Sequence, residues 1–279
     1  MEREIWLEIE GRRIHGWADG ETGPAVLLLH GGGVDSARLS WRLAMPVLAK
    51  DHRVFAFDWP GYGESDAHPG VNSIQFYSDF THQVMDKLGL PKASLAGISL
   101  GGSAALLFGL QYPERVEKLV LVDPYGLQRK VALHGFSYWF VQRPSLTRIS
   151  YAWLRRSRAL TRWTLSYILS RPGSITDELV DELYQIIQKE DIFLPFQSLQ
   201  QSEVLPNGLR TVMIDRVSEL KMPTLIIHGG KDKLVPLACS QEAVRINPDI
   251  QLAVMKGCGH WPQRDWPDEF NRLISEFLK

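Results

Sequence analysis

Short continuous runs of apolar residues alternate along this chain with longer segments in which apolar residues recur at helical spacing. The runs are unbroken, which is typical of strands that are covered on both faces. Helical patterns lie at residues 73–88, 103–108, 238–246 and 266–278. This rhythm predicts an α/β fold with a mostly parallel central sheet and helices on both faces. We expect buried strands at residues 25–29, 53–58, 93–98, 116–122, 224–228 and 251–255.

The beginning of the chain has a different pattern. Residues 4–10 alternate between apolar and polar side chains, Gly11 is a turn residue, and residues 12–17 return as a second candidate strand. Such alternation is typical of strands with one solvated face, so we expect an N-terminal hairpin. Residues 39–50 are expected to form a helix that is interrupted or bent at Pro46.

The alternation of strands and helices stops between residues 125 and 219. This part contains aromatic-rich segments with helical patterns and no run of the buried-strand type. We therefore expect a helical cap of residues 125–219, inserted after the sixth strand and placed over the strand ends. The remaining residues, 1–124 and 220–279, form the predicted core domain. The cap helices are expected at residues 136–140, 151–169 and 176–188.

Composition and charge narrow the range of partners. The chain has 279 residues, of which 44% are hydrophobic and 23% charged, and its formal net charge is -1. These values are ordinary for a soluble globular protein and give no reason to expect nucleic acid as a partner. Two cysteines, Cys239 and Cys258, make no disulfide framework, and with no apolar leader a cytoplasmic protein is the simplest interpretation. Zinc, P-loop and dinucleotide-binding patterns do not occur, so we expect no metal and no cofactor.

The predicted strand at residues 93–98 leads into the strongest chemical motif of the chain. Gly97, Ser99 and Gly101 match the pattern G-x-S-x-G, in which a serine stands on a sharp turn between a strand and a helix. The turn is so tight that small residues are needed two positions before and after the serine. The serine then lies at a helix N-terminus, where free N–H groups stabilise negative charge. We therefore predict that Ser99 is a catalytic nucleophile.

A serine nucleophile needs a general base and a third group that orients the base. Asp232 and His260 follow the last two predicted strands, in glycine-rich loops where their side chains can converge above the sheet. A neutral His260 accepts the Ser99 proton and later passes it to the leaving group. Asp232 fixes the tautomer of His260 in this scheme, and Asp123, which closes an earlier strand, is the competing acid. The predicted triad is Ser99, His260 and Asp232.

Glycines after the first buried strand supply the expected oxyanion hole. Residues 30–33 read His-Gly-Gly-Gly, and such a loop lets the backbone approach a substrate closely. We assign the two N–H donors to Gly32 and to Leu100, the residue after the nucleophile. Gly33 is the alternative to Gly32, and Gly31 completes the backbone that faces the substrate. The histidine of the loop is expected to have a structural role.

Together these motifs make the chain resemble the α/β-hydrolase superfamily over essentially its whole length. The resemblance implies an α/β-hydrolase fold with a helical cap insertion. It also implies a catalytic triad in the chain order Ser-Asp-His, and hydrolysis through an acyl-enzyme. Further segments that carry the resemblance are residues 58–65, 229–236 and 257–260.

A closer resemblance is to the hydrolases that cleave carbon–carbon bonds in meta-cleavage products of aromatic degradation. In that family the tryptophan after the catalytic histidine contacts the substrate, which implies the same for Trp261. The sequence departs from the family at two positions. Ile98 replaces a polar asparagine before the nucleophile, and Leu183 stands where the family has a cap arginine that binds the substrate's carboxylate end. The resemblance is carried by residues 30–33, 259–261 and 268–273.

These two departures bear on the expected substrate. A charged dienoate would lose its anchors, and burying an unpaired charge is costly. We therefore expect hydrolysis of a small or medium apolar carboxylic ester, with C–C bond hydrolysis of a 2-hydroxy-6-oxo-dienoate as the alternative. A non-catalytic ligand-binding protein on the same fold is a third interpretation, and the complete triad argues against it. The sequence leaves the oligomeric state open and is compatible with a homodimer.

The predicted cap has an unusual charge pattern. No acidic residue lies between Asp123 and Asp177, whereas nine arginines and lysines lie in this interval, interleaved with aromatic residues. One hypothesis is a surface that is attracted to anionic lipid or to an anionic substrate. The other hypothesis, which the sequence favours, is that the arginines are solvated on one face while the aromatic residues pack inward.

Overall fold

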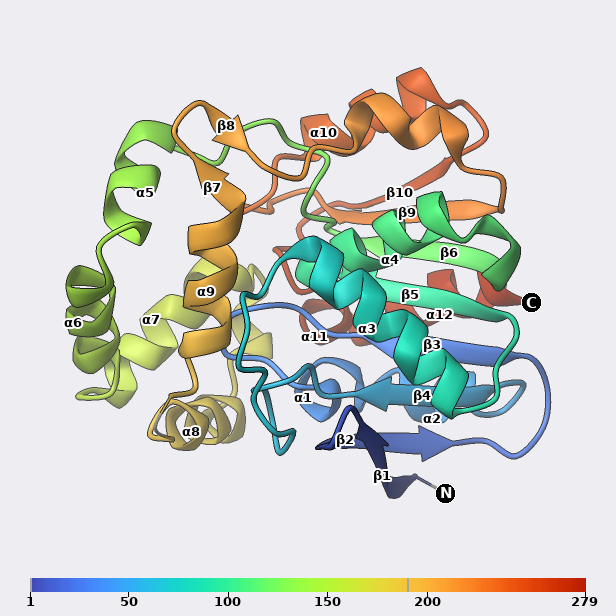
Figure 1. Ribbon diagram of the computed structural model, residues 1–279, viewed down its shortest axis with the longest axis horizontal. Coiled ribbons are helices and arrows are strands. Elements are labelled where there is room, and N and C mark those ends of the chain that lie inside the picture. Colours follow the sequence, from blue (N-terminus) through green and yellow to red (C-terminus); the bar gives the residue numbers. More distant parts are fainter. Residues whose placement is uncertain (1, 190) are drawn as a thin grey trace.

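The computed structural model describes residues 2–189 and 191–279, and an eight-stranded sheet lies at its centre (Figure 1). The strand order is β1-β2-β4-β3-β5-β6-β9-β10. β1 and β2 form the predicted hairpin and β2 runs antiparallel to β4, whereas the neighbours from β4 to β10 are all parallel. The predicted mostly parallel sheet is therefore confirmed. The strands are β1 Arg3–Ile9, β2 Arg12–Asp19, β3 Ala25–Leu29, β4 Arg53–Phe57, β5 Ala93–Ile98, β6 Val116–Val122, β9 Thr224–Gly229 and β10 Gln251–Met255.

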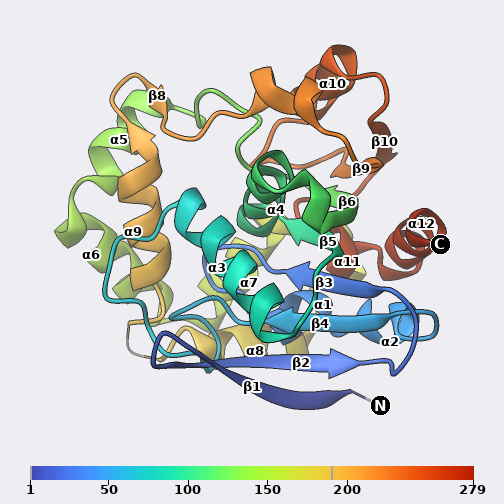
Figure 2. The same ribbon diagram turned by 45° about the vertical axis from the view of Figure 1, so that its right-hand side comes forward.

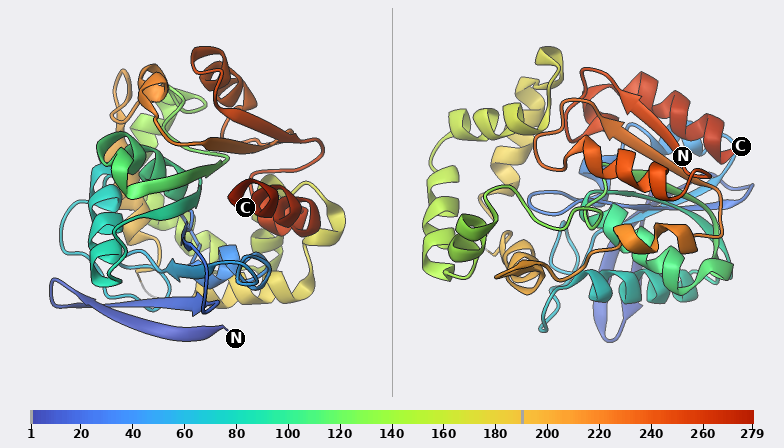
Figure 3. Two further views of the ribbon diagram at one scale, coloured as in Figure 1. Left: turned by 90° about the vertical axis from the view of Figure 1, so that its right-hand side faces the viewer. Right: turned by 90° about the horizontal axis from the view of Figure 1, so that it is seen from above.

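The inner strands bury side chains on both faces, which explains their unbroken apolar runs. In β3, Leu27 and Leu29 pack into one hydrophobic cluster, and Val26 and Leu28 pack into the other. Figure 3 shows α3 and α4 on one side of the sheet and α12 on the other. The helices on the first face are α3 Ile74–Lys87, α4 Leu100–Gln111 and α10 Leu237–Ile246; those on the second are α1 Ala37–Trp41, α2 Met45–Leu48 and α12 Pro267–Leu278, with α11 Pro262–Asp265 just before α12.

Among the described residues, five α-helices lie between β6 and β9, and we call them the cap helices. They stand at the end of the sheet where the parallel strands finish (Figures 1 and 2). No helix in the described ranges is long and apolar enough to cross a membrane. The cap helices are α5 His134–Val141, α6 Pro144–Leu154, α7 Arg158–Ile168, α8 Asp177–Ile186 and α9 Leu194–Glu203. The small hairpin of β7 Val204–Leu205 and β8 Gly208–Leu209 follows them, and the 3-10 turns are η1 Pro113–Arg115, η2 Pro172–Ser174 and η3 Ile214–Glu219.

The structure corrects two of the helix predictions. Residues 39–50 do not form one helix bent at Pro46, because the first helix ends at Trp41 and the proline lies near the start of α2, where its missing N–H is tolerated. Residues 151–169 are also divided, because Ser157 caps a new helix and accepts a hydrogen bond from the Leu160 N–H. The sequence pattern does not predict α9, which buries polar side chains as well as apolar ones.

Candidate active site

Ser99 stands on a strained turn between β5 and α4. Its backbone has φ 51° and ψ -111°, a conformation that residues with a side chain rarely adopt. Glycines on either side permit the turn. A Cβ on Gly97 would lie 2.2 Å from the carbonyl oxygen of Gly101, and a Cβ on Gly101 would lie 2.2 Å from the carbonyl oxygen of Leu29. Both positions therefore require glycine.

Helix α4 begins directly after this serine, at Leu100. The leading N–H groups of a helix have no acceptor in the preceding turn and concentrate positive potential at that end. The side chain of Leu100 is buried in the core. The Leu100 backbone N–H, rather than its side chain, is thus the group that can bind a substrate oxygen beside Ser99.

Asp232 and His260 come together above the sheet from the loops that follow β9 and β10. Oδ2 of Asp232 lies 2.7 Å from Nδ1 of His260. The other carboxylate oxygen accepts hydrogen bonds from the backbone N–H groups of Leu234, at 2.7 Å, and Val235, at 3.1 Å. Burial opposes ionisation of Asp232, but the bond to His260 and the two backbone donors outweigh it and lower the pKa of the carboxyl. An ionised Asp232 leaves Nε2 of His260 as the nitrogen available for proton transfer.

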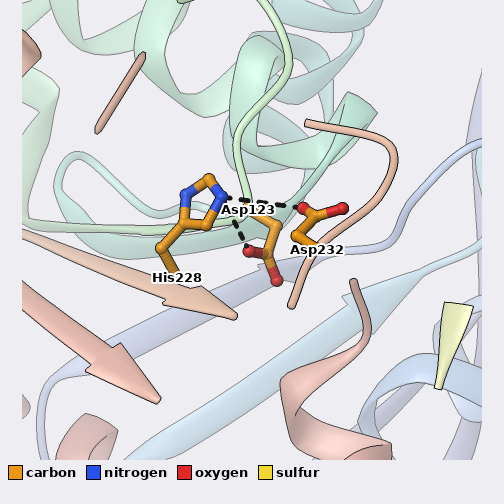
Figure 4. Close-up of side chains that lie close together, drawn as sticks. All are labelled: Asp123, His228 and Asp232. Carbon is orange, nitrogen blue, oxygen red and sulfur yellow. Dashed lines mark ion pairs between the residues drawn. The ribbon is translucent and has the colours of Figure 1, made fainter. Parts of the chain in front are cut away.

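The competing acid, Asp123, lies beside His228, a ring that also faces Asp232 (Figure 4). Asp123 directly follows β6, has φ 41°, is fully buried, and accepts a hydrogen bond from the Gly229 N–H at 2.8 Å. Its Oδ1 also lies 3.4 Å from Nε2 of His228. Burial, together with the negative charge of Asp232, raises the pKa of Asp123 well above its usual value. Ionisation of Asp123 is therefore opposed, and in the described ranges the hydrogen bond of His260 goes to Asp232 rather than to Asp123.

Asp123, His228 and Asp232 offer three possible metal-ligand atoms that lie within 4.8 Å of one another. The histidine does not fit a metal site. Its Nδ1 lies 2.8 Å from the Ser240 hydroxyl, and its Nε2, the nitrogen that faces the carboxyl groups, lies 3.1 Å from the carbonyl oxygen of Val235. An Nε2 that donates to this carbonyl carries a proton and has no lone pair for a metal. We read the cluster as a buried hydrogen-bonded support for Asp232.

The glycine loop after β3 is held by groups that the sequence patterns do not single out. The buried carboxylate of Asp35 accepts hydrogen bonds from the Gly31 N–H and from the Ser40 hydroxyl, both at 2.7 Å. The indole N–H of Trp261 donates to the same hydroxyl at 3.2 Å. The Gly31 N–H is thus occupied, and Gly32 remains the candidate oxyanion donor. Because burial outweighs these donors, the pKa of Asp35 is raised to about 7.

The histidine of this loop, His30, has no free ring nitrogen. Its Nδ1 lies 2.8 Å from the Gly31 carbonyl oxygen, and its Nε2 accepts a hydrogen bond from the Trp59 N–H at 3.0 Å. Burial lowers the pKa of His30 to about 4, so the ring is neutral. These contacts fit the structural role that the sequence predicts for this histidine.

A cavity of about 290 Å³ lies between the strand ends and the cap helices. Asp232 stands behind His260, outside the lining. The cap contributes mainly apolar side chains to the wall, including Leu154 of α6, Leu165 and Ile168 of α7, Leu183 of α8 and Phe196 of α9. The predicted site residues that line it are Gly31, Gly32, Gly33, Ile98, Ser99, His260 and Trp261.

Asp265 at the end of α11 is a second residue that sequence reasoning does not find. It is fully buried and accepts hydrogen bonds from the backbone N–H groups of Gly259, Ser170 and Arg171 and from the Ser174 hydroxyl. The Ile168 carbonyl oxygen accepts a further hydrogen bond from the His260 N–H at 2.7 Å. The loop that carries His260 is thus tied to the segment between α7 and α8. No sequence signal marks this link, because its partners are more than ninety residues apart.

Comparison with known proteins agrees with this fold. The profile of the alpha/beta hydrolase fold family matches residues 24–265. The 2-hydroxy-6-oxononadienedioate/2-hydroxy-6-oxononatrienedioate hydrolase of Comamonas testosteroni is 35% identical over 95% of this chain and 91% of its own length. The 2-hydroxy-6-oxo-6-phenylhexa-2,4-dienoate hydrolase of Burkholderia cepacia is 34% identical over the same shares.

A solved structure shows the same likeness in three dimensions. The meta-cleavage product hydrolase of Pseudomonas fluorescens IP01 superimposes with a TM-score of 0.82 at 30% identity, covering 98% of this chain and 97% of that one. Both chains are covered almost completely, so the likeness includes the sheet and the cap helices. The chain therefore belongs to the α/β-hydrolase fold family, and it is similar to the meta-cleavage product hydrolases within that family.

Proposed function

We propose that this protein is a serine hydrolase that cleaves an uncharged, largely apolar carboxylic ester. The lining of the cavity is the observation that supports this most directly. Apart from Asp35, Ser99 and His260, its described residues offer apolar side chains, glycine backbone and three hydroxyl groups of the cap. Lysine and arginine are absent from the described lining, so an anionic substrate group would be buried there without a counter-charge.

The proposed reaction has two halves. His260 removes the proton from Ser99 Oγ as this oxygen attacks the ester carbonyl carbon, and the carbonyl oxygen becomes negative and accepts hydrogen bonds from the Gly32 and Leu100 N–H groups. His260 passes the proton to the alcohol oxygen, the C–O bond breaks, and the acyl group remains on Ser99. His260 then deprotonates a water that adds to the acyl carbon, and Ser99 leaves with that proton. Asp232 stabilises the imidazolium in both halves.

A second candidate is C–C bond hydrolysis of a 2-hydroxy-6-oxo-dienoate, and the names of the similar proteins favour it over ester hydrolysis. One structural observation also supports it. The guanidinium of Arg264 on α11 lies 5.9 Å from the ring centre of Trp261, and we find no hydrogen bond or ion pair for it in the described ranges. Burial lowers the pKa of Arg264 to about 10. Arg264 itself does not line the cavity, so a substrate carboxylate would gain this counter-ion only by reaching past the wall beside Trp261.

One set of assays tests both candidates. Turnover of p-nitrophenyl esters of increasing acyl length is measured beside turnover of a 2-hydroxy-6-oxo-dienoate, on the wild type and on Ser99→Ala. A higher kcat/KM for the esters supports our proposal. Strong dienoate turnover with negligible ester turnover would instead support C–C bond hydrolysis, the second candidate. Undiminished activity of Ser99→Ala would contradict both candidate functions, because both use Ser99 as the nucleophile. Tight binding of an apolar ester without any turnover would leave a binding protein on a hydrolase fold.

A further inference from the structure

Three consecutive cap helices expose large apolar side chains on their outer faces. The sequence-based expectation that the aromatic residues of this segment pack inward is wrong for five of them, which are between 44% and 62% exposed. We call this set, together with Ile149, the outer aromatic surface. Its residues are Phe136 and Trp139 of α5, Ile149 and Trp153 of α6, and Trp163 and Tyr167 of α7.

The spacing of these residues is regular. Each helix contributes a pair three or four positions apart, so each pair occupies one side of its helix. The opposite sides of α6 and α7 face the cavity through Leu154 and Leu165. These helices therefore carry two apolar faces, one that lines the cavity and one that is exposed to solvent.

Arginine side chains accompany the aromatic ones. The guanidinium of Arg143 lies 4.3 Å from the ring centre of Trp139, and that of Arg156 lies 5.6 Å from the ring centre of Trp153. Both arginines and Arg148 are exposed, and in the ranges that the structure describes none of the three forms an ion pair with an acidic residue. By contrast, Arg158 and Arg162 pair with Asp177 of α8. Arg143 and Arg156 thus place unpaired positive charge directly beside exposed tryptophans.

We propose that the outer aromatic surface docks the protein on an anionic lipid bilayer. Tryptophan and tyrosine have an apolar body and a polar tip, which suits the boundary between headgroups and acyl chains, and arginine adds attraction to anionic headgroups. The position of the surface fits a planar partner, because α5 and α6 form the end of the molecule farthest from the sheet (Figures 1 and 2). Charge complementarity selects an anionic membrane over a neutral one.

The docked arrangement also suggests where substrate comes from. α6 and α7 would touch the bilayer with their outer faces while their inner faces line the cavity beside Ser99. An ester dissolved in the bilayer would then have a short path to the nucleophile. This substrate class rests on the proposed function, whereas the docking itself does not.

Flotation with vesicles tests the docking without any chemistry. The full chain carrying Ser99→Ala is mixed with vesicles of phosphatidylcholine alone or of phosphatidylcholine with phosphatidylglycerol, at rising NaCl concentrations. We expect binding to the anionic vesicles that weakens with salt, and little binding to the neutral ones. Equal binding to both, binding independent of salt, or no binding overturns the proposal.

Two double variants locate the surface. Trp153→Ser with Trp163→Ser is expected to reduce vesicle binding at every salt concentration. Arg148→Glu with Arg156→Glu is expected to reduce it by about fivefold or more per residue and to remove the salt dependence. The matched controls are Trp6→Ser, a tryptophan that is 41% exposed on β1, and Lys50→Glu with Lys87→Glu, of which Lys50 lies in the turn after α2 and Lys87 ends α3. Controls that weaken binding as much as the surface variants would also overturn the proposal.

Two further measurements separate the possible failures. With Ser99 intact, both surface variants are expected to keep wild-type turnover of a short water-soluble ester, which shows that cavity and fold are unchanged. If the wild type hydrolyses no ester, the proposed function fails while the flotation result still stands. Light scattering in buffer checks for a second copy of the chain on this face. The membrane proposal is overturned if the wild type self-associates, the surface variants do not, and the wild type does not bind vesicles. In that case the outer aromatic surface is a dimer interface.

Discussion

The carboxylate of Asp232 lies 2.7 Å from Nδ1 of His260, although the two residues belong to loops that follow different strands. In the proposed mechanism this bond sets the ring tautomer, so that Nε2 accepts the proton of Ser99. Asp232→Asn replaces the acceptor with a group that favours the other tautomer. We expect kcat to fall by about 10⁴-fold with little loss of stability. Ester turnover and urea unfolding measure the two effects, and a fall in kcat below tenfold contradicts the assigned role.

Asp123 is expected to act as a neutral partner. Asp123→Asn keeps an acceptor for the Gly229 N–H, and asparagine tolerates the observed φ of 41°. We therefore expect its kcat and stability to be close to those of the wild type. Asp123→Ala leaves the buried Gly229 N–H unpaired and should lower the free energy of unfolding by about 1–3 kcal/mol. If the asparagine variant loses as much activity as the alanine variant, the carboxyl group acts in its charged form instead.

Asp35 makes stability depend on pH. Its pKa in the folded protein is about 7, above the ordinary value of 3.8, so the unfolded chain releases this proton first as pH rises. The stabilisation is complete below pH 3.8 and is lost as pH approaches 7. Relative to Asp35→Asn, the wild type should lose roughly 4 kcal/mol across this range, at about 1.4 kcal/mol for each pKa unit. Urea unfolding of both proteins at a series of pH values measures this difference, and a difference independent of pH would contradict it.

Gly101→Ala should be severely destabilising. The new Cβ would lie 2.2 Å from the Leu29 carbonyl oxygen, and a backbone atom in the middle of the sheet has no room to move. We expect loss of soluble folded protein, or a fall in the free energy of unfolding of more than about 4 kcal/mol. Gly135→Ala in α5 is the matched control, since its Cβ meets nothing within 4 Å. The control should be neutral or stabilising by up to about 1 kcal/mol, because alanine favours helix.

Arg264 separates the two candidate functions. If the substrate bears a carboxylate that reaches this side chain, Arg264→Gln should raise KM for a 2-hydroxy-6-oxo-dienoate by about tenfold or more, as loss of a charged hydrogen bond does. Hydrolysis of an uncharged p-nitrophenyl ester by the same variant serves as the internal control and should change little. Equal effects on both substrates would mean that Arg264 supports Trp261 rather than the substrate.

The turn at Ser99 and the approach of Asp232 to His260 could be predicted, because the signals for both are local in the sequence. Gly97, Ser99 and Gly101 contain the steric requirement of the turn within five residues. Asp232 and His260 each follow a buried strand, and the carboxyl ends of parallel strands share one edge of the sheet. The family of the chain follows from these positions together.

Other parts depend on contacts between distant segments, which a single sequence does not contain. Asp35 and Asp265 look like ordinary turn or helix-end acids, and only the folded chain shows which N–H groups they accept. The sequence pattern also could not predict which aromatic side chains of the cap face solvent, because both faces of α6 and α7 carry apolar residues. The break before α7 had a local signal, since Ser157 is a good helix cap.

The link between Asp265 and the cap limits how the cavity can open. Residues 168–174 are fastened to the backbone of Gly259 and His260, and a Cβ on Gly259 would lie 2.1 Å from the Ile168 carbonyl oxygen. Lifting this corner of the cap would therefore also displace His260, the base of the proposed mechanism. Because of these bonds, we expect the α7–α8 corner and the loop that carries His260 to keep their relative position when substrate enters the cavity.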